Sequence, residues 1–447
     1  MSNDTRQPLR PRERDAIIQS LRAGVTPRTG LQHIQVGRVR EVEALLQDIR
    51  RISDGGASIR FIIGEFGSGK SFFLQLIRLI ALREGLVTIN ADLSPNRRLY
   101  GTGGQARALY TELLRNISTR TKPDGNALTS IVERFITEAR RQAEATDVEV
   151  AEIIEKRLAH LSELVGGFDF AKVISAYWKG HEQDNEQLKS DAVRWLRGEF
   201  ATKTDARNAL GVRTIVDDAN VYDHLKLLSL FVRQAGYKGL LVNLDEMVSL
   251  YRLATQKARL ANYEQILRIF NDCLQGTAEY IGFLLWGTPD FLMDTRKGLY
   301  SYEALYSRLA ENPPPRSLEI VDYTSPTLHL ANLTPEELLV LLRNLRHVYA
   351  YGDEEKYLLP DEALVAFLAN CSNRLGDAYF RTPRNTIKAF VELLAILDQN
   401  PHLSWDQLIE RVHVQEEFDT DMPGIVADDD DDELTTFRLE EGDEPEP

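Results

Sequence analysis

Residues Gly64–Ser71 read Gly-Glu-Phe-Gly-Ser-Gly-Lys-Ser, which fills every fixed position of a phosphate-binding loop. The glycines allow backbone angles and a close approach that side chains would block, so that successive N–H groups can hold an anion. Lys70 supplies a positive charge for the β- and γ-phosphates, and the Ser71 hydroxyl supplies a ligand for Mg²⁺. The pattern predicts that a nucleotide is bound by Gly64, Glu65, Phe66, Gly67, Ser68, Gly69, Lys70, Ser71 and Phe72.

Two adjacent carboxylates, Asp245 and Glu246, follow the apolar run at residues 239–244. Asp245 is placed to hold Mg²⁺ directly or through water, and Glu246 to polarise the attacking water as a general base. Adjacent residues on a strand point in opposite directions, so the pair can divide these roles only where the strand ends. The alternative is a buried strand that leaves through an acidic turn; beside a phosphate-binding loop, the catalytic interpretation is favoured.

The segments around the loop predict the elements that position it. Residues 59–63 are apolar and predict a buried strand, and residues 71–82 lack Gly and Pro and predict a buried helix. The N-terminus of that helix would direct a partial positive charge toward the phosphates. Residues 85–92 and 281–288 predict further strands. We therefore expect an α/β fold of the P-loop NTPase class, with a parallel sheet at its core.

Composition shifts along the chain divide it into four predicted regions. These are an N-terminal helical extension at 1–35, an ATP-binding domain at 36–325 with a helical insertion at about 93–213, a helical lid at 326–415, and an acidic tail at 416–447. The insertion is expected to hold helices at 106–117, 128–145, 148–164 and 169–178. The lid is expected to begin with a capping box at Thr334–Glu337.

The net charge of −15 is concentrated in the tail, where residues 416–447 hold 15 acidic residues and Arg438, leaving −1 for the rest. The tail is expected to be a disordered, solubilising extension, or alternatively a DNA mimic that occupies a basic groove. Cys273 and Cys371 form no disulfide framework or metal-ligand spacing. No apolar run approaches the roughly 18 residues of a membrane span. We expect a cytoplasmic protein without membrane contact.

The order of these features resembles an AAA+-type ATPase, nearest to the origin-recognition and STAND-like branch. The matching features are Val36–Arg38 before a helix, the phosphate-binding loop, the acidic strand end, and a later strand that ends at Thr288. By this resemblance Thr288 takes the position called sensor 1, which contacts the γ-phosphate or the attacking water. The alternative for Thr288 is that it caps the turn at Pro289–Asp290.

The same resemblance suggests roles for several arginines. Arg308 resembles an arginine finger that reaches a neighbouring subunit's γ-phosphate; it could equally be a surface arginine on an amphipathic helix, and Arg296 and Arg316 are rival candidates. Arg384 resembles the sensor 2 arginine of the lid, with Arg381 in reserve. Arg38 would lie near the adenine. A finger arginine would require self-association.

A closer resemblance covers most of the chain. Residues 64–73, together with residues 91–105, resemble a bacterial family known as BREX-system ATP-binding proteins, which are encoded beside helicases in phage-defence islands. The likeness extends from about Ile17 to Leu397. It implies ATP with Mg²⁺ as cofactors and a helicase or other defence-system protein as partner, without naming a substrate.

DNA contact rests mainly on that resemblance. The loop at residues 96–105 carries Arg97, Arg98, Tyr100 and three glycines. It could contact DNA phosphates or couple the nucleotide state to a partner, or it could simply close over the sheet. No zinc-finger spacing or strongly basic domain is present. We therefore expect an ATP-hydrolysing AAA+-like enzyme that acts with DNA and a helicase. The alternatives are a nucleotide-gated scaffold with little hydrolysis, or a signalling ATPase.

Overall fold

The structure is a computed structural model that describes residues 9–310, 322–375 and 383–409. Arg316, Arg381 and the acidic tail at 416–447, which the sequence analysis singled out, lie outside the described residues.

A five-stranded sheet forms the centre of the described chain, with all neighbouring strands parallel and in the order β2-β3-β4-β1-β5. The strands are β1 (Ala57–Gly64), β2 (Val87–Asp92), β3 (Leu240–Asp245), β4 (Ile281–Gly287) and β5 (Thr327–Leu330). The four strands expected from the sequence are confirmed, whereas β5 was not predicted. Because the strands are parallel, the C-terminal ends of β1, β3 and β4 lie at the same edge of the sheet.

Helices cover both faces of the sheet, which makes this a mixed α/β fold. Helices α2 (Val39–Ser53) and α3 (Lys70–Glu84) pack on one face, where Phe73 contacts Trp286 edge to face at 6.0 Å between ring centroids. On the other face lie α4 (Gln105–Arg115) and α10 (Val221–Gln234) and, at its side, α12 (Gln256–Gln275). Alternate residues of each strand point to opposite faces of the sheet. In β3, for example, Leu241 packs on the face covered by α3 and Val242 on the face covered by α10.

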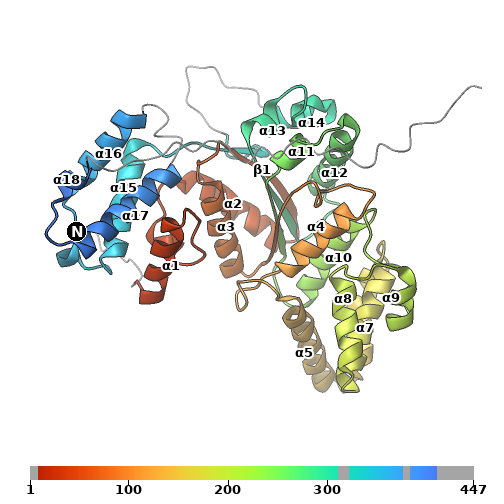
Figure 1. The fold of residues 1–447 in the computed structure, drawn as a ribbon. Coiled ribbons are helices and arrows are strands. Elements are labelled where there is room, and N and C mark those ends of the chain that lie inside the picture. Colours follow the sequence, from red (N-terminus) through yellow and green to blue (C-terminus); the bar gives the residue numbers. More distant parts are fainter. Residues whose placement is uncertain (1–8, 311–321, 376–382, 410–447) are drawn as a thin grey trace, which may run out of the picture.

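The region between β2 and β3 is helical, as predicted, and Figure 1 shows its helices extending away from the sheet. They are α4 (Gln105–Arg115), α5 (Leu128–Thr146), α6 (Val150–Ser162), α7 (Gly167–Glu182), α8 (Glu186–Leu196), α9 (Lys203–Leu210) and α10 (Val221–Gln234). The short helices α8 and α9 were not predicted. Phe170 packs on both Trp195 and Phe231, and the apolar interior of this region is continuous with that of the sheet.

The C-terminal helices form a second hydrophobic core together with the N-terminal helix α1 (Pro11–Arg22). They are α15 (Pro335–Tyr349), α16 (Asp361–Leu375), α17 (Pro383–Gln399) and α18 (Trp405–Ile409). Ile17 of α1 is fully buried in this core with Leu342 and Phe390. The predicted capping box is confirmed, since Glu337 N donates to Thr334 Oγ1 (3.2 Å) and Thr334 N to Glu337 Oε2 (3.0 Å). Figure 1 shows α1 (red) beside these helices (blue), so the two ends of the described chain build one helical body.

Short elements complete the described chain: the 3₁₀ turns Leu31–His33, Leu299–Ser301 and Glu354–Lys356, and the helices α11 (Val248–Tyr251), α13 (Pro289–Met293) and α14 (Glu303–Leu309). Among the residues that the structure describes, no helix has the length and apolar character to cross a membrane.

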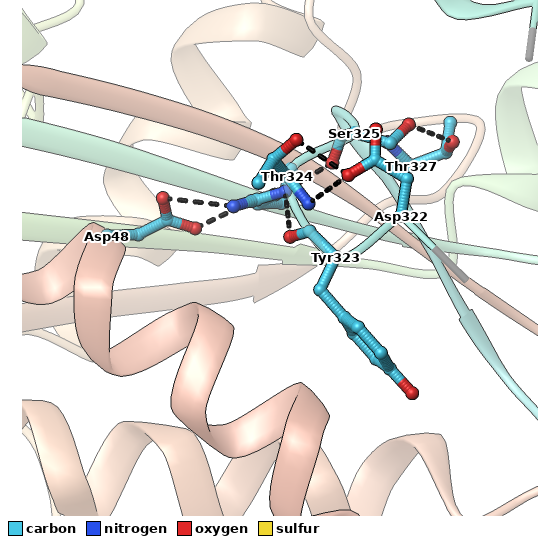
Figure 2. A network of polar contacts seen from close by, with 7 residues as sticks. Asp48, Asp322, Tyr323, Thr324, Ser325 and Thr327 are labelled. Atoms are coloured by element: carbon cyan, nitrogen blue, oxygen red, sulfur yellow. Dashed lines mark hydrogen bonds and ion pairs between the residues drawn. The ribbon is translucent and has the colours of Figure 1, made fainter. Parts of the chain in front are cut away.

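A buried ion pair fixes the edge of the sheet next to β5. Arg60 of β1 donates to both carboxylate oxygens of Asp48 of α2, at 2.6 and 3.3 Å, and both side chains are buried. The same guanidinium donates to the carbonyl oxygens of Tyr323 (3.0 Å) and Ser325. Figure 2 shows Asp48 on one side of this network and the turn from Asp322 to Ser325 on the other. The network therefore holds the segment that leads into β5 against β1.

Candidate functional site

The loop between β1 and α3 has the backbone conformation that its glycines allow. Gly67 and Gly69 have φ of +79° and +86°, a region that side chains rarely adopt. A Cβ at Gly64 would lie 2.5 Å from Ser68 Oγ, so this position has no room for a side chain. Gly69 is the residue before α3, and Lys70 and Ser71 form its first turn. The loop thus places the first-turn N–H groups of α3, which have no partner within the helix, and the positive end of α3 on one side of the sheet edge.

Lys70 turns back onto its own loop. Its Nζ donates to the carbonyl oxygens of Gly64 and Glu65, both at 2.8 Å, and lies 5.3 Å from the centroid of the Phe66 ring. Burial lowers the pKa of this ammonium, while the carboxylates of Asp245 and Glu246 act in the opposite direction. The lysine therefore lies within the electrostatic reach of the acidic end of β3.

At that end the chain turns sharply. Glu246 has φ of +55°, and its N–H donates to Asp245 Oδ1 at 2.8 Å. Burial raises the pKa of Asp245 to about 6, and the carboxylates of Glu246 and Asp92 act in the same direction, against the effects of the Glu246 N–H and Lys70. The left-handed turn lets two adjacent carboxylates face the same space, which a continuing strand would not allow.

Thr288 follows β4 directly and is 6 % exposed. Its hydroxyl accepts from Phe291 N at 3.4 Å and so caps α13, as the structural alternative in the sequence analysis predicted. The residue also lines the cavity described next. The capping contact does not remove it from the site; it fixes where the hydroxyl lies.

A cavity of about 910 Å³ opens above the ends of β1, β3 and β4, within the size range of small-molecule sites. It brings together Lys70, Ser71, Asp245, Glu246 and Thr288. Residues 65–69, 72 and 73 also line it, as do residues 24–27 after α1, residues 34–36, and Leu341, Pro383, Arg384 and Ile387 of the C-terminal helices. The cavity therefore lies between the sheet and the helical body that α1 shares with the C-terminus.

Arg38 lines this cavity and contacts three segments of the chain. Its guanidinium donates to Ser68 O in the loop (2.8 Å) and to Ala331 O after β5 (2.6 Å), and it lies near Glu41 (3.8 Å). Burial lowers its pKa, with Glu41 and then Glu337 acting in the opposite direction. The side chain thus connects the loop to the segment that enters the C-terminal helices.

Three other residues singled out from the sequence lie in different surroundings. Arg384, at the start of α17, lines the cavity wall opposite the strands, and its aliphatic stem lies against Gly24. Arg308 lies outside the cavity on α14, where its side chain is exposed and donates to Ala304 O at 2.6 Å. Arg296 is also outside the cavity, with its side chain 88 % exposed.

The loop at residues 96–105 is anchored to the protein. Arg97 pairs with Glu112 at 3.6 Å, Arg98 is 2 % exposed, and Tyr100 N donates to Asn262 Oδ1 at 2.9 Å. Asp218 accepts from Gly104 N at 2.6 Å. These contacts favour the structural interpretation of the loop over phosphate contact by its two arginines.

Sequence reasoning missed Arg252 and Trp286, which both line the cavity. Trp286 belongs to an apolar strand, and its residue type gave no sign that it lay beneath the loop. Arg252 follows a helix of only four residues, too short to be recognised by periodicity. The participation of residues 24–27 was also missed, because a strand-and-loop motif says nothing about which distant segment closes over it.

The donor set fits Mg²⁺ held in part by a nucleotide. In the described part of the chain, no group of three or more His, Cys, Asp or Glu residues could hold a metal ion alone. Ser71 and Asp245 do line one cavity, and Mg²⁺ commonly takes one or two protein oxygens together with phosphate oxygens and waters.

A comparison with protein families returned a match over residues 9–413, to the family described as BREX system ATP-binding protein BrxC/D. The chain belongs to this BrxC/D family. The match confirms the resemblance drawn from residues 64–73 and 91–105, and it covers the sheet, the helical region and all the described C-terminal helices. The family description supports ATP as the ligand and BREX phage defence as the setting. No curated protein matches the chain.

Proposed function

We propose that this BrxC/D family member is a Mg²⁺-dependent ATPase with an AAA+-like P-loop core. One observation carries the proposal. Lys70 and Ser71 from the loop, Asp245 and Glu246 from the end of β3, and Thr288 from the end of β4 line a single cavity. These are the groups that phosphoryl transfer to water requires: an anion-binding backbone, a cation, a metal ligand, a general base and a polar contact for the attacked phosphate.

The strand order supports this assignment. Strands β3 and β4 lie between β1 and β2, so that the loop after β1 adjoins the end of β4, and the end of β3 comes next. Residues far apart in the sequence are thereby set side by side at the edge where parallel α/β sheets place their ligands.

Binding of ATP requires Lys70 to exchange partners. Its Nζ would leave the carbonyl oxygens of Gly64 and Glu65 for the β- and γ-phosphates, so that the incoming charge replaces two neutral acceptors. The N–H groups of residues 67–71 would hold the phosphates at the N-terminus of α3.

Ser71 and Asp245 would hold Mg²⁺, which when bound neutralises phosphate charge. Glu246, placed by its left-handed turn beside Asp245, would accept the proton of the attacking water. Thr288 would orient that water or the γ-phosphate through its hydroxyl, whose position the cap of α13 fixes.

The remaining walls suggest where the nucleoside lies. Val25, Ile34, Val36 and Ile387 provide an apolar wall remote from the carboxylates, suited to a base. Arg38 would act near that side, and Arg384 would contact the nucleotide from the C-terminal helices. In this arrangement residues 36–325 are the ATP-binding domain and the C-terminal helices act as a lid.

Assembly and partners complete the proposal. Arg308 is exposed and outside its own cavity, so it could reach a γ-phosphate only in a neighbouring copy, which motivates self-association. Family membership motivates a defence-system partner such as a helicase, and DNA as the shared substrate.

A nucleotide-gated scaffold is the second candidate. The observation that favours it is that the cavity is closed partly by the helical body of α1 and the C-terminal helices. A bound nucleotide would therefore fix that body against the sheet. This change of shape could itself be the protein's function, for example by controlling assembly, without rapid ATP hydrolysis.

Nucleotide binding by the Lys70→Ala variant tests the shared part of both candidates. We expect ATP affinity measured by calorimetry with Mg²⁺ to fall by at least about 100-fold, because a buried charge-assisted contact to phosphate is lost. Unchanged affinity in a folded variant would remove the loop from the site.

A further inference from the structure

One cationic side chain of the cavity, Arg252, follows closely in the chain after the strand end that carries the two carboxylates. Arg252 lines the cavity together with Asp245, Glu246 and Val248. It comes one helical turn after Val248, and its N–H donates to Val248 O at 3.1 Å. Residues four apart lie on the same face of a helix, which explains why these two side chains both face the cavity while Leu250, between them, is fully buried.

The short helix α11, which ends at the residue before Arg252, is held on both sides. Ser249 Oγ donates to Leu93 O, after β2, at 3.1 Å, and Tyr251 hydroxyl donates to Asp294 Oδ2, after α13, at 3.0 Å. Met247 N donates to Trp286 O of β4 at 3.1 Å. Hydrogen bonds therefore connect the backbone next to Arg252 to both strands that flank β3. The Cα of Arg252, from which its long side chain extends, is thereby held in place.

The other cations that line the cavity, within the described residues, have different positions. Lys70 belongs to the loop, Arg38 donates to the backbone at Ser68 and Ala331, and Arg384 lies at the opposite wall against Gly24. Arg252 alone among these four follows the carboxylate strand end, on the side where the proposed general base would direct water at the γ-phosphate.

We propose that Arg252 binds the γ-phosphate of ATP within the same chain. A guanidinium offers several N–H donors in a plane that match phosphate oxygens, and its charge would stabilise the charge that develops during transfer. The inference rests on the proposed ATPase function and deepens it, since it supplies in cis the positive charge that Arg308 could bring only from another copy.

The test compares Arg252→Ala and Arg252→Lys with wild type in binding and turnover. Binding of ADP and of a non-hydrolysable ATP analogue is measured with Mg²⁺. We expect Arg252→Ala to lower the affinity for the analogue by roughly 10- to 100-fold, while the affinity for ADP changes by less than about 2-fold. The two should differ because only the analogue carries a group in the γ-phosphate position. Turnover should fall by at least about 10-fold, with partial recovery in Arg252→Lys. Lys257→Ala, which removes an exposed cation outside the cavity, is the matched control and should match wild type.

A mixing experiment separates action within one chain from action between chains. Arg252→Ala, whose turnover is reduced, is mixed with Lys70→Ala, which is not expected to bind ATP. No recovery of turnover is expected, whereas recovery would show that Arg252 acts on a neighbouring copy. Provided that wild type binds ATP, an equal loss of affinity for ADP and the analogue would also overturn the inference. So would unchanged affinity for both. If wild type binds neither nucleotide, the proposed function itself fails and this inference with it.

Discussion

The acidic strand end shows most clearly how one residue's backbone decides the chemistry. Asp245 and Glu246 could be identified from the sequence as a pair of carboxylates after an apolar run. The φ of +55° at Glu246, which lets both carboxylates face the cavity, could not be identified from the sequence. A non-glycine residue in this region is uncommon and often marks a functional site. The residue types were visible in the sequence, but the turn depends on β4 and α13 packing beside it.

The raised pKa of Asp245 makes a prediction about stability. Its carboxyl has a pKa of about 6 in the folded chain against an ordinary value of 3.8, so ionisation disfavours the nucleotide-free fold. This penalty is absent below about pH 4, grows between pH 4 and 6, and is complete above pH 6. Asp245→Asn should therefore stabilise the nucleotide-free protein at pH 8, by up to about 3 kcal/mol, and have little effect at pH 4.

Thermal unfolding at both pH values measures this effect. Asp92→Asn is the matched control, since Asp92 pairs in register with Asp245 but is exposed, and it should give a smaller shift of the same sign. A lower melting temperature for Asp245→Asn at pH 8 would contradict the account.

At the scale of elements, strands β1 to β4 and helix α3 could be predicted because long apolar runs and the glycine loop mark them. Strand β5 could not, because only four residues form it and neither length nor alternation distinguishes them from a loop. Helix α1 could be predicted, yet its partner could not. An amphipathic helix shows that one face is buried, not that Ile17 and Ile18 pack with residues more than 300 positions away.

The ion pair between Arg60 and Asp48 gives a prediction at this scale (Figure 2). Removing either partner alone leaves a buried charge, so Arg60→Met or Asp48→Leu by itself should lower the free energy of unfolding by about 3–5 kcal/mol. Arg60→Met with Asp48→Leu should recover most of that loss, because no charge is then buried unpaired. Chemical denaturation of the four proteins measures the coupling; additive losses in the double variant would show that the pair does not act as a unit.

At the scale of the whole molecule, the site is completed by segments from both ends of the described chain. Residues 24–27, Leu341 of α15 and the start of α17 close a cavity whose floor is the edge of the sheet. Phe72, next to Ser71, packs against both the core of the sheet and the core of the C-terminal helices. Nucleotide state and the position of the helical body are therefore expected to be coupled. Sequence reasoning could place the loop, but not this closure, since it depends on long-range packing.

Assembly gives the prediction that belongs to this scale. If Arg252 acts within the chain and Arg308 on a neighbour, dilute protein should retain a basal turnover, and turnover per chain should rise with protein concentration. Arg308→Ala should remove the increase and leave the basal rate. Mass measurement in ATP alongside the rates checks the oligomer directly. A rate per chain that is independent of concentration while the mass increases would remove Arg308 from the mechanism.

DNA dependence belongs to the same experiment. Turnover that rises with duplex or single-stranded DNA, and loses this rise as salt increases, would support a motor that contacts phosphates. No response at any salt concentration would favour the nucleotide-gated scaffold.

The measurement that tests the central claim most directly is ATP turnover by the purified protein, wild type against Glu246→Gln, with ATP binding measured on both. The account predicts turnover by wild type, and in the variant a loss of at least about 100-fold with ATP still bound, because the general base is gone while the loop and Mg²⁺ ligands remain. Equal turnover in the two proteins would contradict the role of Glu246, and ATP bound by both without turnover would show that this cavity holds a nucleotide but does not hydrolyse it.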